Sequence, residues 1–320
     1  MDPGLLLSKF EGALLGTAVG DALGASFEGG GVLGEALKSL YPKVIERRRT
    51  LVYTDDTHMM IGVAESLIEK KGFDPEHMAW TFIRNWEKEP FRGYGPGPPR
   101  IFRMIKNGEP WDKAARKLYG GGSFGNGAAM RIAPIGIFFH DRPEELREAA
   151  LRSSEITHAH PLGKEGGLLQ AGAVALATKL KPEEELDPEE FLLSLSGLIE
   201  EEVLKAKLVK IGELLARGER NPERVARELG NGVEAQNSVP SAIFSFLSHP
   251  RSFREAVLFA ISLGGDTDTI GAMTGAISGA FLGSEAIPEE WRRKLENRSY
   301  IEELGRKLWE IKAKSPKPEG

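Results

Sequence analysis

Two short turns hold the side chains of this sequence that are best suited to chemistry. The sequence TDDT at residues 54–57 precedes a helical pattern that begins near His58, and DTDT at residues 266–269 precedes another. An aspartate before a helix is most often its cap, but only one of the adjacent pair Asp55 and Asp56 can be the cap, and the two repel each other. A hard cation removes that repulsion, because Mg²⁺ and Mn²⁺ take carboxylate and hydroxyl oxygens in octahedral geometry.

The second turn is built in the same way. Gly264 and Gly265 let the backbone fold tightly before it. Asp266 and Asp268 alternate along an extended turn, so both can point at one ion, and the hydroxyl of Thr269 can complete its shell. A helix N-terminus opposes a cation through its dipole, so such a site needs several carboxylates, and the two turns provide four. Two turns of this kind predict two metal ions, about 4 Å apart as in other binuclear hydrolases.

A glycine-rich stretch at residues 120–127 precedes a further predicted helix. Successive backbone amides near a helix N-terminus form a nest for anions, which suits phosphates. The stretch is neither a Walker motif nor a dinucleotide fingerprint. Phe124 offers a ring that can stack on a base, and an ordinary core aromatic is the alternative interpretation.

A pair of histidines lies at positions 158 and 160. Zinc would need a third nitrogen or sulfur ligand nearby, and the sequence offers none. We therefore interpret His158 as a neutral side chain that hydrogen-bonds a hydroxyl or phosphate of a ligand. The other histidines, at positions 58, 77, 140 and 249, are interpreted as structural or surface residues.

The elements that must position these residues are predicted to be helices, ten or more of them in an all-α fold. Apolar residues recur at three- and four-residue spacing in 5–23, 59–68, 78–86, 129–138, 168–180, 191–215, 242–247, 253–263 and 270–282. Asp74, Asp187 and Asn221 each stand before a proline and an acid, the pattern of a helix start. No two runs alternate with period two around an Asn-Gly or Asp-Gly turn, so no hairpin is predicted.

Two of these predicted helices, at residues 12–20 and 271–280, consist almost wholly of small residues. A glycine inside a helix costs about 1 kcal/mol relative to alanine, and close helix–helix packing is the usual compensation. We predict that both are buried central helices that bring the two ends of the sequence together. Such packing would place Glu28, shortly after the first helix, near the aspartate turn that starts the second.

Composition limits the classes of function. The 320 residues carry 42 Lys+Arg and 47 Asp+Glu, a net charge of −5, and no cysteine. No basic stripe is present, so general nucleic-acid binding is not expected. Disulfides, thiolate ligands and a cysteine nucleophile are excluded. The most apolar stretch, residues 270–283, is shorter than the ~20 residues that span a bilayer.

The organisation of the chain follows from the same features. We predict one domain at residues 1–310 and a flexible tail at residues 311–320. The N-terminus lacks the basic start and cleavage site of a secretory signal. A soluble cytoplasmic protein without a membrane partner is therefore expected.

The motifs resemble, in their order, those of the ADP-ribosylglycohydrolase family, which includes the dinitrogenase-reductase-activating glycohydrolases and the mammalian ADP-ribosyl-acceptor hydrolases. The matching pieces are GALLG at 12–16, GDALG at 20–24 with Glu28 following, YTDDT at 53–57, YGPG at 94–97, SFGNGAAMR at 123–131, TH at 157–158 and GGDTDT at 264–269. They cover roughly residues 10–285, and their combination is specific even where a single piece is not.

The resemblance implies an all-α orthogonal multi-helix bundle with two Mg²⁺ or Mn²⁺ ions at helix N-termini. The implied metal ligands are Thr54, Asp55, Asp56, Asp266, Asp268 and Thr269. The implied catalytic residues are Glu28, Asp55 and Asp56. The implied ligand contacts are Gly97 at the distal ribose, His158, and a diphosphate loop of Gly122, Ser123, Phe124, Gly125, Asn126 and Gly127. In the serine-type hydrolases aromatic rings flank the adenine, whereas here Phe124 stands on one side and Leu118, followed by Tyr119, on the other.

The implied reaction is hydrolysis of the glycosidic bond between ADP-ribose and a modified acceptor, a protein side chain or another ADP-ribosylated group. Cleavage of a ribosyl bond develops oxocarbenium character, a metal pair can orient the ribose and polarise a water, and Glu28 can act as general acid or base. Two alternatives stay open: a binuclear phosphohydrolase of nucleotides or sugar phosphates, and a non-catalytic ADP-ribose-binding member, as the lens crystallins of this family illustrate. The motifs do not specify the acceptor linkage, whether arginine, serine or another.

Overall fold

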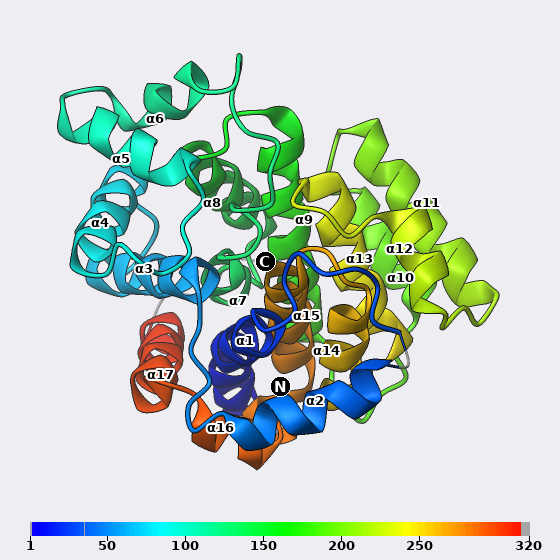
Figure 1. Ribbon diagram of the computed structural model, residues 1–320. Coiled ribbons are helices and arrows are strands. Elements are labelled where there is room, and N and C mark those ends of the chain that lie inside the picture. The colour runs from blue at the N-terminus through cyan, green and yellow to red at the C-terminus, as the bar shows by residue number, and fades with distance from the viewer. Residues whose placement is uncertain (1, 35, 315–320) are drawn as a thin grey trace.

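The computed structural model describes residues 2–34 and 36–314, which are almost entirely helical (Figure 1). Within these ranges there are seventeen α-helices, two 3₁₀-helices and no β-strand, which confirms the all-α prediction. The α-helices are α1 (Pro3–Gly24), α2 (Ala36–Arg47), α3 (Asp55–Lys70), α4 (Pro75–Lys88), α5 (Gly97–Lys106), α6 (Trp111–Ala114), α7 (Ala133–Phe138), α8 (Pro143–Glu155), α9 (Pro161–Lys179), α10 (Pro188–Ser196), α11 (Glu202–Ala216), α12 (Pro222–Leu229), α13 (Ala235–Ser248), α14 (Phe253–Ser262), α15 (Thr267–Leu282), α16 (Glu289–Lys294) and α17 (Arg298–Lys314). The 3₁₀-helices are η1 (Ala115–Lys117) and η2 (Ser284–Ala286).

The predicted helix starts are confirmed by their caps. The side chains of Asp74, Asp187 and Asn221 accept hydrogen bonds from backbone amides in the first turns of α4, α10 and α12. A side-chain oxygen at this position satisfies amides that have no partner within the helix. The capping residues therefore fix where these helices begin.

One predicted helix is two in the structure. The run at residues 191–215 breaks between α10 and α11. The carboxylate of Glu165, on α9, accepts hydrogen bonds from the amides of Glu200 and Glu201, at 2.8 and 2.7 Å. Because a carboxylate from another helix satisfies these amides, the chain turns here and starts α11 afresh.

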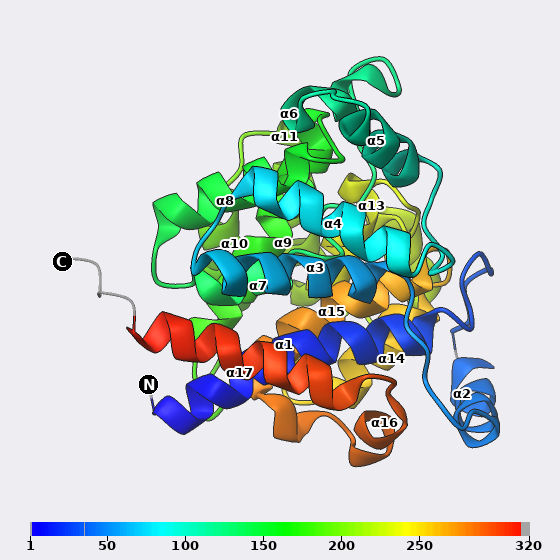
Figure 2. The same cartoon turned by 90° about the vertical axis from the view of Figure 1, so that its left-hand side faces the viewer.

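Helices α1 and α15 lie side by side at the centre of the molecule (Figures 1 and 2), as the two small-residue segments predicted. They run antiparallel, and their glycines meet in pairs. A Cβ placed on Gly16 would lie 2.1 Å from the carbonyl oxygen of Gly275, and one on Gly20 would lie 2.0 Å from that of Gly271. The two backbones are thus in direct contact, which only glycine permits.

Replacing Gly275 by alanine is expected to destabilise the protein by about 1–3 kcal/mol, because the new methyl group collides with backbone that cannot rotate away. Its Cβ would lie 2.0 Å from the carbonyl oxygen of Gly16. Gly212, within α11, is the matched control, since its Cβ would meet only Leu192 Cδ1 at 3.7 Å. Gly212→Ala should stabilise by up to about 1 kcal/mol through helix propensity. Urea unfolding measures both, and equal changes in the two variants would contradict the prediction.

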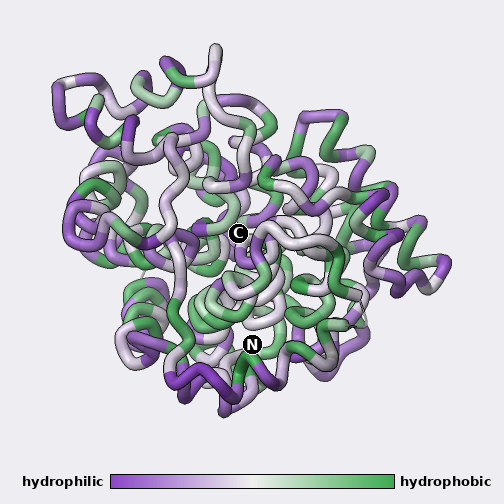
Figure 3. The backbone as a smooth tube through the Cα atoms, viewed as in Figure 1, coloured by the Kyte–Doolittle hydropathy of each residue, from purple (hydrophilic) through white to green (hydrophobic). Residues whose placement is uncertain are grey.

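Amphipathic helices cover the central pair. Figure 3 shows white and green along the central helices and purple mostly on the outer helices and loops. Helix α17 packs against α1, α3 and α7. None of the helices in the described ranges has the length and apolar character needed to cross a bilayer.

The last helix runs past the expected domain boundary. Helix α17 continues through residues 311–314, which were predicted to belong to a flexible tail. Lys312 is buried there, donates a hydrogen bond to Asp141 Oδ1, and lies over the ring of Phe138. These contacts hold the last turn of the helix. The rest of the predicted tail, residues 315–320, lies outside the described residues.

The antiparallel pairing of α1 and α15 brings the acidic segments of the chain together. The C-terminal end of α1 lies beside the N-terminal end of α15, since Gly24 contacts Thr267. Helix α3 packs against both α1 and α15 (Figure 2), and its first residue is Asp55. The loop after α1 and both aspartate turns therefore converge on one place.

Candidate metal centre and active site

A buried aspartate of α1 holds the first turn in shape. The carboxylate of Asp21 accepts hydrogen bonds from four donors, the amides and hydroxyls of Thr54 and Thr57, at 2.6 to 3.1 Å. Burial raises the pKa of Asp21 to about 6, although these hydrogen bonds act to lower it. Asp21 thus fixes the backbone from which Asp55 and Asp56 project.

The second turn is tied to the loop that carries Glu28. Gly264 and Gly265 have φ of +68° and +70°, in the left-handed region that glycine favours. The amide of Gly265 donates to the carbonyl of Gly30, and the amide of Gly29 donates to the carbonyl of Gly265. This paired backbone places Glu28 next to the aspartates that follow.

The two turns and the loop form one acidic centre. Carboxylate oxygens of Glu28, Asp266 and Asp268 all lie within 4.8 Å of one another. Asp56 is buried, and its Oδ1 has no hydrogen-bond partner among the described residues. A buried carboxylate oxygen without a donor is costly unless a cation faces it. The donor set consists of hard oxygens, which is the set that Mg²⁺ or Mn²⁺ takes.

Burial and mutual repulsion disfavour ionisation of these side chains. The pKa of Asp55 rises to about 7 and that of Asp268 to about 9, chiefly through burial and then through neighbouring carboxylates. The pKa of Asp56 lies well above its ordinary range for the same two reasons. Burial also raises the pKa of Asp266, and burial and then Asp266 raise that of Glu28. The centre can therefore be fully ionised only when positive charge compensates it.

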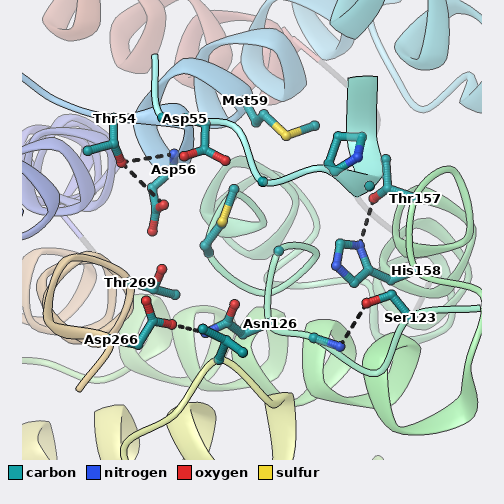
Figure 4. A pocket seen from close by; sticks show the side chains of 18 of the residues that line it. Thr54, Asp55, Asp56, Met59, Ser123, Asn126, Thr157, His158, Asp266 and Thr269 are labelled. Carbon is teal, nitrogen blue, oxygen red and sulfur yellow. Dashed lines mark hydrogen bonds between the residues drawn. The ribbon is translucent and has the colours of Figure 1, made fainter. Parts of the chain in front are cut away.

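The acidic centre forms one end of a cavity of ≈ 330 Å³. Figure 4 shows Asp55, Asp56 and Asp266 on one side and Ser123, Thr157 and His158 on the other. The predicted site residues that line this cavity are Glu28, Thr54, Asp55, Asp56, Gly97, Ser123, Gly125, Asn126, Gly127, His158, Asp266, Asp268 and Thr269. The structure thus brings together residues that are more than 200 positions apart in the sequence.

Two predicted site residues face elsewhere. Gly122 is not part of the cavity wall, and a Cβ placed on it would lie 2.7 Å from Ala159 Cβ, so this glycine allows the loop to pack against the start of α9. The ring of Phe124 makes an edge contact with His160 and is also outside the cavity wall. Phe124 is 46% exposed, which excludes the core-aromatic interpretation as well.

The glycine-rich loop differs from the predicted nest in one respect. Residues 127–131 form turns, and α7 begins only at Ala133 because Pro134 fits the first turn of a helix. No helix N-terminus therefore follows the loop directly.

The backbone amides of the loop divide into two groups. The amides of Gly121, Gly122, Gly125 and Asn126 donate to protein oxygens. Within the described chain, those of Gly120, Ser123, Phe124 and Gly127 donate to none. Of these residues, Ser123 and Gly127 line the cavity, so their amides are the ones that remain for an anionic ligand there.

Asn126 links the loop to the acidic centre. Its amide nitrogen donates to Ser238 Oγ and to Asp266 Oδ2. The bond to Asp266 lowers the pKa of that carboxyl against the larger effect of burial. The side chain of Asn126 thus orients a carboxylate of the centre, in addition to lining the cavity.

His158 closes the other end of the cavity. Burial, followed by the charge of Arg131, lowers its pKa to about 3, so the ring is neutral at any pH near 7. Its Nδ1 lies 2.8 Å from Thr157 Oγ1. A neutral histidine is what the sequence predicted for this position.

A family model of ADP-ribosylglycohydrolases matches residues 2–317. The chain belongs to the ADP-ribosylglycohydrolase family. ADP-ribosylhydrolase ARH3 of Homo sapiens is 35% identical over 97% of this chain and 95% of the human protein. ARH3 of Xenopus tropicalis is 37% identical over 95% of this chain and 96% of its own length.

A solved structure has the same fold. One chain of an ADP-ribosylglycohydrolase-related protein complex is 27% identical and superposes with a TM-score of 0.72, covering 97% of this chain and 99% of its own. Together with the family model and the ARH3 relatives, this similarity confirms the predicted family and the prediction that the chain is a hydrolase of glycosidic bonds.

Several residues that line the cavity of this ADP-ribosylglycohydrolase were not predicted from the sequence. Tyr119 lines the cavity, whereas Leu118 is buried and does not. Tyr119 has a φ of +55°, which is uncommon for a residue with a side chain and turns its ring toward Gly97. A local sequence carries no signal for that backbone conformation. Thr157, Met59 and Met130 also line the cavity.

Proposed function

We propose that the cavity binds the ADP-ribosyl group of a modified acceptor and hydrolyses the bond between its ribose and the acceptor, releasing ADP-ribose. The single observation that carries the proposal is the two-ended cavity. Acidic side chains gather at one end, and a neutral histidine and unpaired amides lie at the other. A ribose with its reacting bond suits the first end, and a diphosphate suits the second.

We propose further that the acidic end holds divalent metal, two Mg²⁺ ions or Mn²⁺ in their place. The residues that would hold them are Thr54, Asp55, Asp56, Asp266, Asp268 and Thr269. The orphaned Oδ1 of Asp56 and the close oxygens of Asp266 and Asp268 support this assignment. When bound, such ions neutralise the carboxylates and act as Lewis acids toward the ribose hydroxyls and a water.

The chain's own residues supply the remaining chemistry. Glu28 is exposed, whereas Asp266 and Asp268 of the same cluster are buried, so Glu28 can exchange a proton with solvent. It lies on a loop held by backbone hydrogen bonds to Gly265. We assign to Glu28 the proton transfer of the reaction, as general acid or base. Asp55 and Asp56 orient the reacting groups from the opposite side.

The other end of the cavity holds the rest of the ligand. His158 and the amides of Ser123 and Gly127 bind the diphosphate, and the distal ribose lies near Gly97. Tyr119 is the aromatic ring that the cavity offers to the adenine. The partner is expected to be an ADP-ribosylated substrate, and we take a protein side chain as its first candidate acceptor.

The test is release of ADP-ribose from a panel of ADP-ribosylated arginine, serine and nucleic-acid acceptors, with Mg²⁺ or Mn²⁺ and with a chelator. Release from at least one acceptor, lost in the chelator, is expected. No release from any acceptor by metal-loaded protein would overturn the proposal. Orthophosphate release from nucleotides or sugar phosphates would instead identify a phosphohydrolase. Tight binding of ADP-ribose without any turnover would identify a non-catalytic member.

A further inference from the structure

A positively charged side chain lies buried behind the cavity. Arg131 is 0% exposed, and no carboxylate of the described residues forms an ion pair with it. Its Nη1 donates to Thr157 Oγ1 at 2.8 Å, its Nη2 donates to the Ser153 carbonyl at 2.9 Å, and it lies over the Phe82 ring at 4.7 Å. Burial lowers the pKa of Arg131 to about 9, so it is still protonated at neutral pH.

The hydroxyl of Thr157 connects this arginine to His158. Thr157 Oγ1 lies 2.8 Å from His158 Nδ1. Arginine is always the donor, so Oγ1 accepts from Arg131 and its own proton is free to donate. The only other partner of that hydroxyl in the described chain is Nδ1. If Nδ1 carried a proton, the buried Thr157 proton would have no acceptor, which costs about 1–3 kcal/mol.

The ring must therefore carry its proton on Nε2. This atom makes no hydrogen bond within the described residues, and His158 lines the cavity opposite the acidic centre (Figure 4). Glycine makes room for it, since a Cβ on Gly127 would lie 3.0 Å from Nε2. The wall of the cavity thus offers one N–H whose orientation is set from behind.

We propose that Arg131 is a positioning residue which acts through Thr157 to hold His158 as its Nε2–H tautomer, so that the cavity presents a hydrogen-bond donor to an anionic oxygen of the ligand. The choice of a diphosphate oxygen as that ligand atom rests on the proposed function, whereas the tautomer does not. Each donor in the series Arg131, Thr157 and His158 polarises the next. The guanidinium charge therefore strengthens the Nε2–H group as a donor without entering the cavity. The histidine itself stays neutral.

A purely structural role for Arg131 is the competing explanation. A buried arginine that only fills the core would leave the tautomer of His158 unchanged when its guanidinium is removed. Thr157→Val has nearly the same shape and removes the hydroxyl alone, and Thr157→Ser is the matched variant that keeps it. Arg131→Met removes the donor and retains a long side chain.

The experiment is ¹⁵N NMR of histidine-labelled protein without ligand, combined with calorimetric binding of ADP-ribose. His158 is identified by the signals that disappear in His158→Gln. The wild type is expected to show the pattern of a neutral Nε2–H ring. Thr157→Val and Arg131→Met should lose this preference, with ADP-ribose affinity about tenfold weaker in Thr157→Val, and Thr157→Ser should restore both properties.

An Nδ1–H ring in the wild type, or an unchanged tautomer in folded Thr157→Val, would overturn the proposal. Failure of Thr157→Ser to restore the tautomer would also overturn it, because the hydroxyl would then not be the connecting group. A folded Arg131→Met with an unchanged tautomer would show that the arginine only fills the core, and it would overturn the proposal. If that variant does not fold, the two Thr157 variants still test whether the hydroxyl sets the tautomer. If the wild-type protein has the Nε2–H ring but no affinity for ADP-ribose, the proposed function is contradicted and the positioning role of Arg131 is retained.

Discussion

Glu28→Gln is expected to lower the turnover of ADP-ribosylated substrate by about 10²- to 10⁴-fold, the range of general acid–base catalysis. The amide keeps the size of the carboxylate but cannot take up or release the proton. The four aspartates of the two turns remain in place, so metal and ADP-ribose affinity should stay near the wild-type values. Steady-state kinetics with the best acceptor of the panel, and calorimetry with ADP-ribose, measure the two quantities.

The matched control is Glu223→Gln. Glu223 lies against Gly34, which is in the same loop segment as Glu28, but it does not line the cavity. Its replacement removes one negative charge from the same region and should leave turnover within about twofold of wild type, as expected of a surface change. Normal turnover in Glu28→Gln would remove Glu28 from the mechanism. A joint loss of turnover and ADP-ribose affinity would assign it to binding instead.

The position of Glu28 illustrates what a sequence can predict of such a site. The runs of small residues in α1 and α15 are a local pattern, and they indicated that the two helices pack together. That pairing brings the end of α1 next to the start of α15. Glu28, which follows α1, therefore lies close to Asp268. The long-range geometry followed from the sequence because close helix–helix packing is the usual compensation for so many helical glycines.

Other features depend on contacts that no local pattern encodes. Asp21 reads as one polar residue in an apolar helix, yet its carboxylate holds the turn of Thr54 and Thr57. The break before α11 depends on Glu165, which is 35 residues away. The place of the ring of Tyr119 depends on a left-handed φ that its own side chain disfavours. Each of these is fixed by tertiary structure, and spacing rules therefore cannot find it.

The acidic centre also sets how stability responds to pH when metal is removed. The folded-state pKa values of Asp55 and Asp268 are raised to about 7 and about 9, above the ~4 of an unfolded aspartate. A raised carboxyl pKa contributes no penalty while the group is protonated in both states, and the penalty grows as pH rises from the unfolded value to the folded value, above which it is constant. In a chelator, thermal stability should therefore fall between about pH 5 and pH 9.

Divalent metal is expected to reverse that fall. A cation that binds only the folded, ionised centre stabilises it by mass action, so the melting temperature gained on adding Mg²⁺ should be largest near pH 9 and small near pH 5. A shift of several degrees is expected, because about 1 kcal/mol corresponds to roughly 2–4 °C in a large domain. Differential scanning fluorimetry with and without Mg²⁺ at each pH measures it.

Asp56→Asn separates the two roles of the centre. The buried amide cannot ionise, so this variant should melt higher than the wild type in a chelator at pH 9, where the wild-type carboxylates repel one another most. It should lose most of the Mg²⁺-dependent gain and at least about 10²-fold in turnover, since a ligand for the Lewis acid is missing. Asp112→Asn, in α6 and outside the cavity, is the control and should follow the wild type throughout. An Asp56→Asn protein that keeps full metal response and turnover would show that this carboxylate is not a ligand. The predicted opposition of stability and activity at one residue distinguishes a metal-binding carboxylate from one that merely lies in the first turn of α3, which Thr54 caps.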